Sequence, residues 1–149
     1  MIDGRPVVDL AVAGLASGLG DDLLSVVVYG SRSRGTARVD SDWDVLVIAR
    51  GLPARVLARH VLLKRMLPSS VRGMVAIYAL TPEELSTAWP PPALHLDIAL
   101  DAEVAYDPSR LAATWISRVR AAIDAEGLCR VDTAFGKQWR RSGSVTQVP

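Results

Sequence analysis

The amino-acid sequence predicts an α/β (α+β) fold, with a single mixed β-sheet of about four to five strands flanked by helices. Two observations lead to this prediction. Short apolar runs rich in β-branched residues alternate along the chain with longer segments in which apolar residues recur at helical spacing. The chain has 149 residues, half of them hydrophobic, which suffices for one buried core but is short for two. We therefore expect one domain over residues 1–149.

The first part of the chain predicts two strands joined by a short connection. A helix is expected over residues 7–19, because its apolar residues form one stripe and glycines follow. A buried strand is expected over 24–29, a helical turn over 31–37 and a second strand over 42–49. The connection between the two strands therefore opens with a turn.

The second part continues the alternation. Residues 53–67 are expected to form a helix between two prolines, and 71–80 a third strand. The sequence Thr81-Pro82-Glu83-Glu84 is a capping box with proline at the first helical position, and it predicts a short helix to about Trp89. Alternating apolar residues predict a fourth strand over 94–100, and 103–106 continues the sheet after a turn.

The end of the chain predicts one more helix. Ser109 is expected to cap a helix that runs to about Glu126. The polar segment from about residue 140 is expected to be mobile.

Composition restricts the class of function. The formal net charge of +1 disfavours a strongly electrostatic nucleic-acid binder. Cys129 is the only cysteine, so no intramolecular disulfide can form and a reducing cytoplasm is the expected location. We expect no signal peptide and no membrane span, because no apolar run approaches the ~20 residues that a span needs.

Residues 30–44 carry the most informative pattern, Gly-Ser-Arg-Ser-Arg-Gly-Thr-Ala-Arg-Val-Asp-Ser-Asp-Trp-Asp. Asp42 and Asp44 are two residues apart at the start of a strand, so their side chains project to one face and Trp43 points the other way. Two carboxylates this close repel each other, and a divalent cation removes that conflict. The pair therefore predicts a metal site.

The turn before this strand is suited to phosphate. Glycine at position 30 lets the backbone approach a ligand, and the free amides of the following helical turn favour an anion. The hydroxyl of Ser31 adds a donor, and Arg32 is a candidate phosphate ligand. Gly30, Ser31 and Arg32 are therefore the predicted nucleotide-binding residues.

A third carboxylate is predicted from the strand expected over 94–100. Strand parity places Asp97 on one face together with His95, Ala99 and Asp101. An acid in the middle of an apolar strand is costly unless it is paired or bound to metal, so Asp97 is the chosen ligand. We interpret Asp101 as a turn residue and His95 as a hydrogen-bonded structural residue.

These residues resemble a known family. Gly30-Ser31, Gly35 and Ser41-Asp42-Trp43-Asp44 look like the signature of the nucleotidyltransferase superfamily with the DNA polymerase β-like fold, and the short chain is similar to its minimal (MNT-type) members. The segment from Leu96 to Asp107 resembles a later strand of small members.

The resemblance implies Mg²⁺-dependent transfer of a nucleoside monophosphate from a nucleoside triphosphate, with ATP as the expected donor, to an acceptor hydroxyl. By the same analogy, Asp42 and Asp44 hold two Mg²⁺ ions. Asp97 holds the catalytic ion, and Gly30 and Ser31 bind the β- and γ-phosphates. The extra helical domain that binds the acceptor in larger members is not expected here.

The acceptor and the partners stay open. The resemblance implies a protein or RNA acceptor, and a role as the antitoxin of a small helical HEPN-type toxin. A homo-oligomer is compatible with the sequence. Two alternatives remain: a non-catalytic module that neutralises a partner by contact, and an aminoglycoside-type transferase that modifies a small molecule.

Overall fold

A four-stranded mixed sheet forms the centre of the computed structural model, which describes residues 5–142. The strands lie in the order β3-β2-β1-β4, where β1 is antiparallel to β2 and β4, and β2 is parallel to β3. Their bounds are Leu23–Tyr29 for β1, Trp43–Ala49 for β2, Val75–Leu80 for β3 and Glu103–Tyr106 for β4. The predicted fold class, one mixed sheet with flanking helices, is confirmed.

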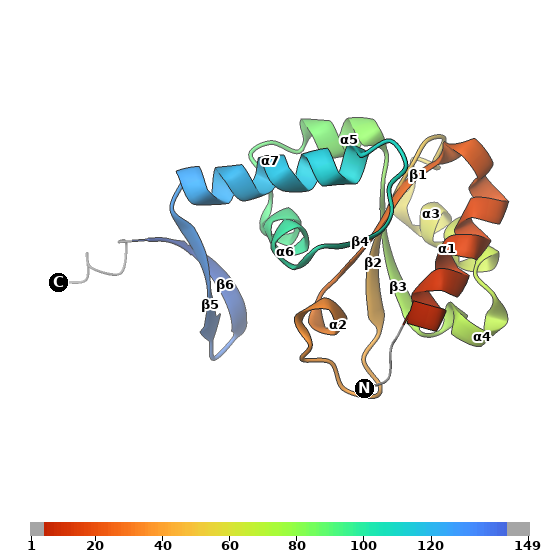
Figure 1. Ribbon diagram of the computed structural model, residues 1–149, viewed down its shortest axis with the longest axis horizontal. Coiled ribbons are helices and arrows are strands. Elements are labelled where there is room, and N and C mark those ends of the chain that lie inside the picture. The colour runs from red at the N-terminus through yellow and green to blue at the C-terminus, as the bar shows by residue number, and fades with distance from the viewer. Residues whose placement is uncertain (1–4, 143–149) are drawn as a thin grey trace.

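Helices cover both faces of this sheet (Figure 1). One apolar cluster joins the sheet to α1 and α3, and a second joins it to α5, α6 and α7. The helices are α1 (Arg5–Leu19), α2 (Ser31–Arg34), α3 (Val56–Met66), α4 (Ser69–Arg72), α5 (Pro82–Thr87), α6 (Ala93–Asp101) and α7 (Leu111–Ala125), with a 3-10 turn at Gly20–Asp22. The sheet is therefore the middle of three layers.

Strand β2 confirms the parity argument for its own residues. Leu46 and Ile48 belong to the cluster with α6 and α7, whereas Val45 and Val47 belong to the cluster with α1 and α3. Because side chains alternate along a strand, Asp44 points toward the face that α6 and α7 cover. Trp43 packs on the opposite face, as predicted.

The predicted strand over 94–100 is wrong, because these residues form helix α6. Leu94 and Leu100 are each 41% exposed, although strand parity grouped them with the core residues. The buried residues follow helical spacing instead: His95, Leu96, Ile98 and Ala99. Alanine and leucine favour helix, and the segment holds a single β-branched residue, so helical propensity and packing on α7 prevail over the alternation.

Two further element boundaries differ from the prediction. Residues Ser69–Arg72 form α4 rather than the start of the third strand. Ser109 does not cap α7; the carboxylate of Asp107 accepts hydrogen bonds from the amides of Ala112 at 3.0 Å and Ala113 at 2.9 Å. The capping carboxylate comes from a residue before the helix. Arg110, which directly precedes α7, has a left-handed backbone conformation.

The capping box is confirmed, since Thr81 and Glu84 bond each other's backbone amides at the start of α5. The prediction missed a C-terminal hairpin of β5 (Leu128–Thr133) and β6 (Gly136–Arg141), which stands apart from the main sheet in Figure 1. Within residues 140–142, where a mobile end was expected, β6 is still paired to β5, and residues 143–149 lie outside the described part.

None of the helices among the described residues is long and apolar enough to cross a bilayer. The expectation that residues 1–149 form a single domain stays a prediction.

Candidate functional site

Gly30 joins β1 to α2 and touches the start of β2. It is buried and adopts φ 80° and ψ −157°, a conformation that side-chain-bearing residues rarely take. Tyr29 is paired with Asp44 across the sheet, and a Cβ added at Gly30 would overlap the Oδ2 atom of Asp44. Glycine is therefore required here for two independent reasons, its backbone conformation and the close approach of a carboxylate.

Helix α2 turns the chain immediately after this glycine. Ser31 is its first residue, and the amide of Arg34 donates to the carbonyl of Gly30 at 3.0 Å. Gly35 ends the helix in a left-handed conformation. The Gly-Ser turn thus lies beside the strand end that carries the two aspartates, as the sequence predicts.

Asp42 and Asp44 share this corner, and among the described residues neither forms a salt bridge. Asp42 is exposed and Asp44 is half-buried. Burial raises the pKa of Asp44, the charge of Asp42 raises it further, and Arg34 offsets only part of this effect. Burial and the charge of Asp44 also raise the pKa of Tyr29 to about 12. The charges of this corner therefore raise the pKa values of two neighbouring groups, the carboxyl of Asp44 and the hydroxyl of Tyr29.

This carboxylate pair fits a divalent cation. Carboxylates whose ionised form is disfavoured by a neighbouring acid gain from a hard cation with oxygen ligands. Among the described residues, no group of three or more histidine, cysteine, aspartate or glutamate side chains is arranged to hold a metal. The substrate phosphates would have to supply further oxygen ligands.

Arg32 holds the loop that leads to Asp42. Its guanidinium donates to the carbonyl of Ser41 at 2.8 Å and to that of Val39 at 3.2 Å, and it lies over the ring of Trp43. Arg32 thus fixes the backbone just before the aspartate pair. Its predicted role as a phosphate ligand stays a prediction.

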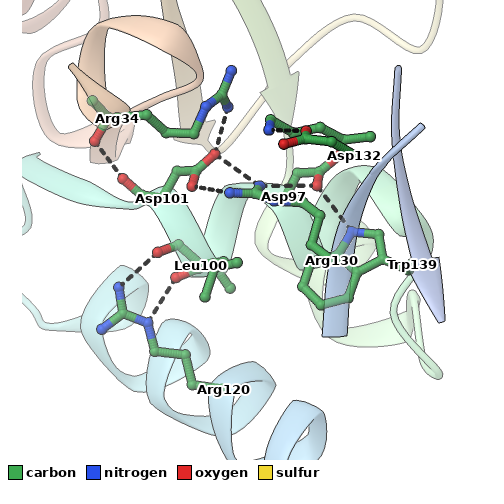
Figure 2. Close-up of polar contacts among 11 residues, drawn as sticks. Arg34, Asp97, Leu100, Asp101, Arg120, Arg130, Asp132 and Trp139 are labelled. Carbon is green, nitrogen blue, oxygen red and sulfur yellow. Dashed lines mark hydrogen bonds and ion pairs between the residues drawn. The ribbon is translucent and has the colours of Figure 1, made fainter. Parts of the chain in front are cut away.

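A second pair of aspartates lies on α6 and is neutralised (Figure 2). Arg130 of the hairpin contacts Asp101 through two nitrogens, at 2.7 and 3.0 Å, and Asp97 at 3.1 Å. The indole of Trp139 donates to Asp97 at 2.9 Å. The structure therefore places Asp97 in an ion-pair cluster between α6 and the hairpin.

Asp101 connects this cluster to the Gly-Ser turn. Its carboxylate accepts from Arg34 at 2.8 Å, and its carbonyl accepts from the hydroxyl of Ser33. The side chain is only 4% exposed, and although burial raises its pKa, the hydrogen bonds and charges of Arg130 and Arg34 lower it overall. Arg120 joins α7 to the end of α6, because it donates a hydrogen bond to the carbonyl of Ala99 at 2.7 Å.

Sequence reasoning missed Arg34, Asp101 and Arg130 as members of one cluster. Asp101 is an ion-pair residue at the end of α6, not a turn residue. The available signal was the spacing of Asp97 and Asp101, which puts both on one face of a helix as well as of a strand. The interpretation of His95 is confirmed, since its Nε2 lies 2.9 Å from the hydroxyl of Tyr78 in the core.

A family model described as a nucleotidyltransferase domain matches residues 17–91, half of the chain, from the end of α1 past the aspartate pair. The chain belongs to this family. The resemblance inferred from Gly30-Ser31 and Asp42-Trp43-Asp44 is confirmed.

The nucleotidyltransferase domain also matches one curated relative. A Methanocaldococcus jannaschii protein whose name describes a protein adenylyltransferase is 53% identical over 45 residues, which are 30% of this chain and 31% of that protein. The match therefore spans about a third of the relative's length.

Solved structures share the fold of this nucleotidyltransferase domain. The MNT antitoxin in complex with a tri-AMPylated Shewanella oneidensis HEPN toxin is similar with a TM-score of 0.55 at 13% identity, over 83% of this chain and 88% of the other. A toxin–antitoxin structure with AMP-PNP gives 0.51 at 19% identity, over 78% and 90%. A nucleotidyltransferase structure from Sulfolobus solfataricus gives 0.50 at 22% identity, over 70% and 81%.

Proposed function

We propose that this chain transfers a nucleoside monophosphate from ATP to an acceptor hydroxyl in a reaction that depends on Mg²⁺. The observation that carries the proposal is the close approach of the Gly30 backbone to Asp44, beside a second unneutralised carboxylate. A Gly-Ser turn and two carboxylates that lie in one corner of the sheet support the binding of phosphates and of a divalent cation there. Membership of the nucleotidyltransferase domain family supports the reaction class.

Each residue of the corner has a part in the proposed reaction. Asp42 and Asp44 would hold the cation, and the backbone of Gly30 and the hydroxyl of Ser31 would bind the β- and γ-phosphates. When bound, Mg²⁺ neutralises phosphate charge and supports an in-line displacement. The acceptor oxygen bonds to the α-phosphorus, the bond from that phosphorus to the bridging oxygen breaks, and pyrophosphate leaves while the hydroxyl proton passes to a base.

Two predicted ligands have other partners in the structure. For Asp97 to hold the catalytic ion, its carboxylate would have to exchange Arg130 and Trp139 for the metal. For Arg32 to bind phosphate, it would have to release carbonyls of its own loop. We keep both roles as proposals and rank them below those of Asp42, Asp44, Gly30 and Ser31.

We further propose a protein hydroxyl as the acceptor and an antitoxin role in the cytoplasm. The name of the curated relative, a protein adenylyltransferase, favours a protein over an RNA acceptor. The fold likeness to an MNT antitoxin bound to an AMPylated HEPN toxin suggests a small helical toxin as the partner. Among the described residues, Asp97 and Asp101 are already paired with Arg130, which disfavours a role for them in an acidic aminoglycoside pocket.

A transfer assay tests the proposal. The protein is incubated with ATP labelled at the α-phosphate, Mg²⁺ and a co-expressed HEPN-type protein, and label is followed on that partner. We expect transfer, and we expect Asp42→Asn combined with Asp44→Asn to lower its rate at least ~100-fold, because the ion would lose both protein carboxylates. Asp40→Asn, an exposed acid in the same connection, is the matched control and should leave the rate unchanged.

Three outcomes would count against the proposal. Label transfer that survives the double substitution would remove the aspartates from the reaction. Absence of transfer with every nucleoside triphosphate and acceptor, together with full neutralisation of the toxin by the double variant, would favour the non-catalytic binding module. Label on an aminoglycoside alone would favour the small-molecule transferase.

A further inference from the structure

Helix α3 is apolar on two opposite sides, although only one of them meets the core. The inner side is buried and includes Arg59 and Leu63. The outer side exposes Leu57 by 73%, Val61 by 41% and Leu62 by 37%. Surface helices normally turn polar residues outward, so an apolar outer side indicates a surface that is covered in the working protein.

The outer residues form a helical stripe beside a groove. Leu57 and Val61 are four residues apart, as are Ala58 and Leu62, so they lie on neighbouring rows of one face. With Pro53, Arg55 and Arg65 they line a shallow hollow of about 520 Å³. We call this surface the α3 groove. A stripe of this kind accepts the apolar side chains of a second helix.

The segment that contains α3 is rich in positively charged residues. Residues 45–82 contain six of the chain's seventeen lysines and arginines and none of its sixteen acidic residues. Arg59 is paired with Glu84, but among the described residues the guanidinium groups of Arg55 and Arg65 have no partner. Two free cations therefore flank an apolar stripe in a chain whose net charge is only +1.

From this juxtaposition we infer that the α3 groove binds an amphipathic helix of a partner protein, whose apolar stripe is flanked by aspartate or glutamate. A second copy of this chain is disfavoured, because a two-fold contact would bring the Arg55 and Arg65 groups of both copies together. A nucleic acid is disfavoured, because such interfaces are polar, whereas Val56 and Leu57 are exposed apolar residues.

The α3 groove is separate from the proposed transfer corner. Leu63 of α3 belongs to the apolar cluster on the α1 side of the sheet, whereas Asp44 points to the side of α6 and α7. A helix bound at the groove would leave the corner open to nucleotide and acceptor. The inference is therefore independent of whether the chain transfers nucleotides.

Binding of fluorescent helical peptides to the whole chain tests the inference. One peptide carries leucines at helical spacing flanked by glutamates, and the second carries lysines in place of the glutamates. We expect the glutamate peptide to bind about tenfold more tightly, since two charge pairs at a partly exposed rim contribute up to about 1 kcal/mol each. The preference should shrink as salt is added.

Variants separate the apolar contribution from the charges. Leu57→Ser with Val61→Ser should weaken the glutamate peptide at least about tenfold, because each side chain would lose apolar burial. Arg55→Glu with Arg65→Glu should reverse the preference toward the lysine peptide. Leu10→Ser, which changes an exposed leucine of α1 (44% exposed), is the matched control and should have no effect. Circular dichroism checks that each variant is folded.

Four results would overturn the inference. The first is that neither peptide binds, and the second is that both peptides bind equally well. The third is that light scattering shows a homodimer, which the Leu57→Ser substitution dissociates. The fourth is binding of an RNA oligonucleotide that requires Arg55 and Arg65 but not Leu57 and Val61.

Discussion

The molecule contains two pairs of aspartates with opposite surroundings. Asp42 and Asp44 lie at the beginning of β2, where burial and the charge of Asp42 raise the pKa of Asp44 and Arg34 offsets only part of this effect. Asp97 and Asp101 lie one turn apart on α6 and accept hydrogen bonds from Arg130, Arg34 and Trp139. Residues of the same type therefore have different surroundings: the carboxylates of Asp97 and Asp101 are paired with arginines, whereas Asp42 and Asp44 are the pair for which we propose a cation.

The difference shows why residue type alone does not define a metal site. A carboxylate that already accepts from a bidentate arginine gains little from Mg²⁺, since the ion would first have to displace a buried partner. A carboxylate that is half-buried beside another acid is less stable without a cation than with one. The local balance of charge, read from the contacts, distinguishes the two pairs.

The largest expected effect on stability comes from Asp101→Asn. Removing this charge leaves Arg130, whose side chain is 11% exposed, without its main partner, and weakens the contact of Arg34. We expect a loss of roughly 3–5 kcal/mol in the free energy of unfolding, measured with a chemical denaturant. Asp132→Asn, on the hairpin that carries Arg130, is the matched control: its side chain is 82% exposed, so the free energy of unfolding should change far less than for Asp101→Asn.

Equal small losses in both of those variants would show that the cluster between α6 and the hairpin does not stabilise the fold, and the contrast between the two aspartate pairs would lose its basis.

The stability gained from Asp101 should depend on pH. Because the pKa of Asp101 is lowered in the folded state, its contribution is complete above the pKa of the unfolded chain, about 3.9, and is lost as pH falls through the lower folded value. The difference in unfolding free energy between the wild type and Asp101→Asn should therefore be constant from pH 7 to about 5 and shrink below about pH 4. Denaturant titrations at several pH values measure it. A difference that grows on acidification would contradict the assignment.

The smallest effect, with the opposite sign, is expected for Asp44→Asn. Burial and Asp42 both raise the pKa of Asp44, so the ionised form destabilises the folded chain at neutral pH in the absence of a cation. The substitution removes that charge and should raise the free energy of unfolding by about 0.5 kcal/mol, because the site is partly solvated. The same measurement as for Asp101→Asn, made without Mg²⁺, tests the sign. A clear loss of stability would mean that Asp44 is a structural acid, like Asp101.

Much of the corner around Gly30 and Asp44 could be predicted from the sequence, because its residues lie close together along the chain. Gly30, Ser31, Asp42 and Asp44 lie within fifteen residues, between two apolar runs that could only be strands. Once those strands pair, the period of two sends Asp44 to one face and Trp43 to the other, and Asp42 lies just before the strand. The capping box of α5 could be predicted for the same reason, since all its hydrogen bonds join neighbouring residues.

Only the tertiary structure decided which side chains neutralise Asp97 and Asp101. Residues 94–100 alternate in hydrophobicity, yet helical propensity together with packing on α7 makes them a helix, and the alternation does not reveal that contact. The partners of Asp97 and Asp101 lie 29 to 42 residues away on a hairpin, or on α2, so their neutralisation cannot be derived from spacing. The sequence by itself determined that the Gly-Ser turn and Asp44 lie close together, because backbone geometry dictates how residues at such short spacings are arranged. Which remaining acids are free depended on long-range contacts that exist only in the folded chain.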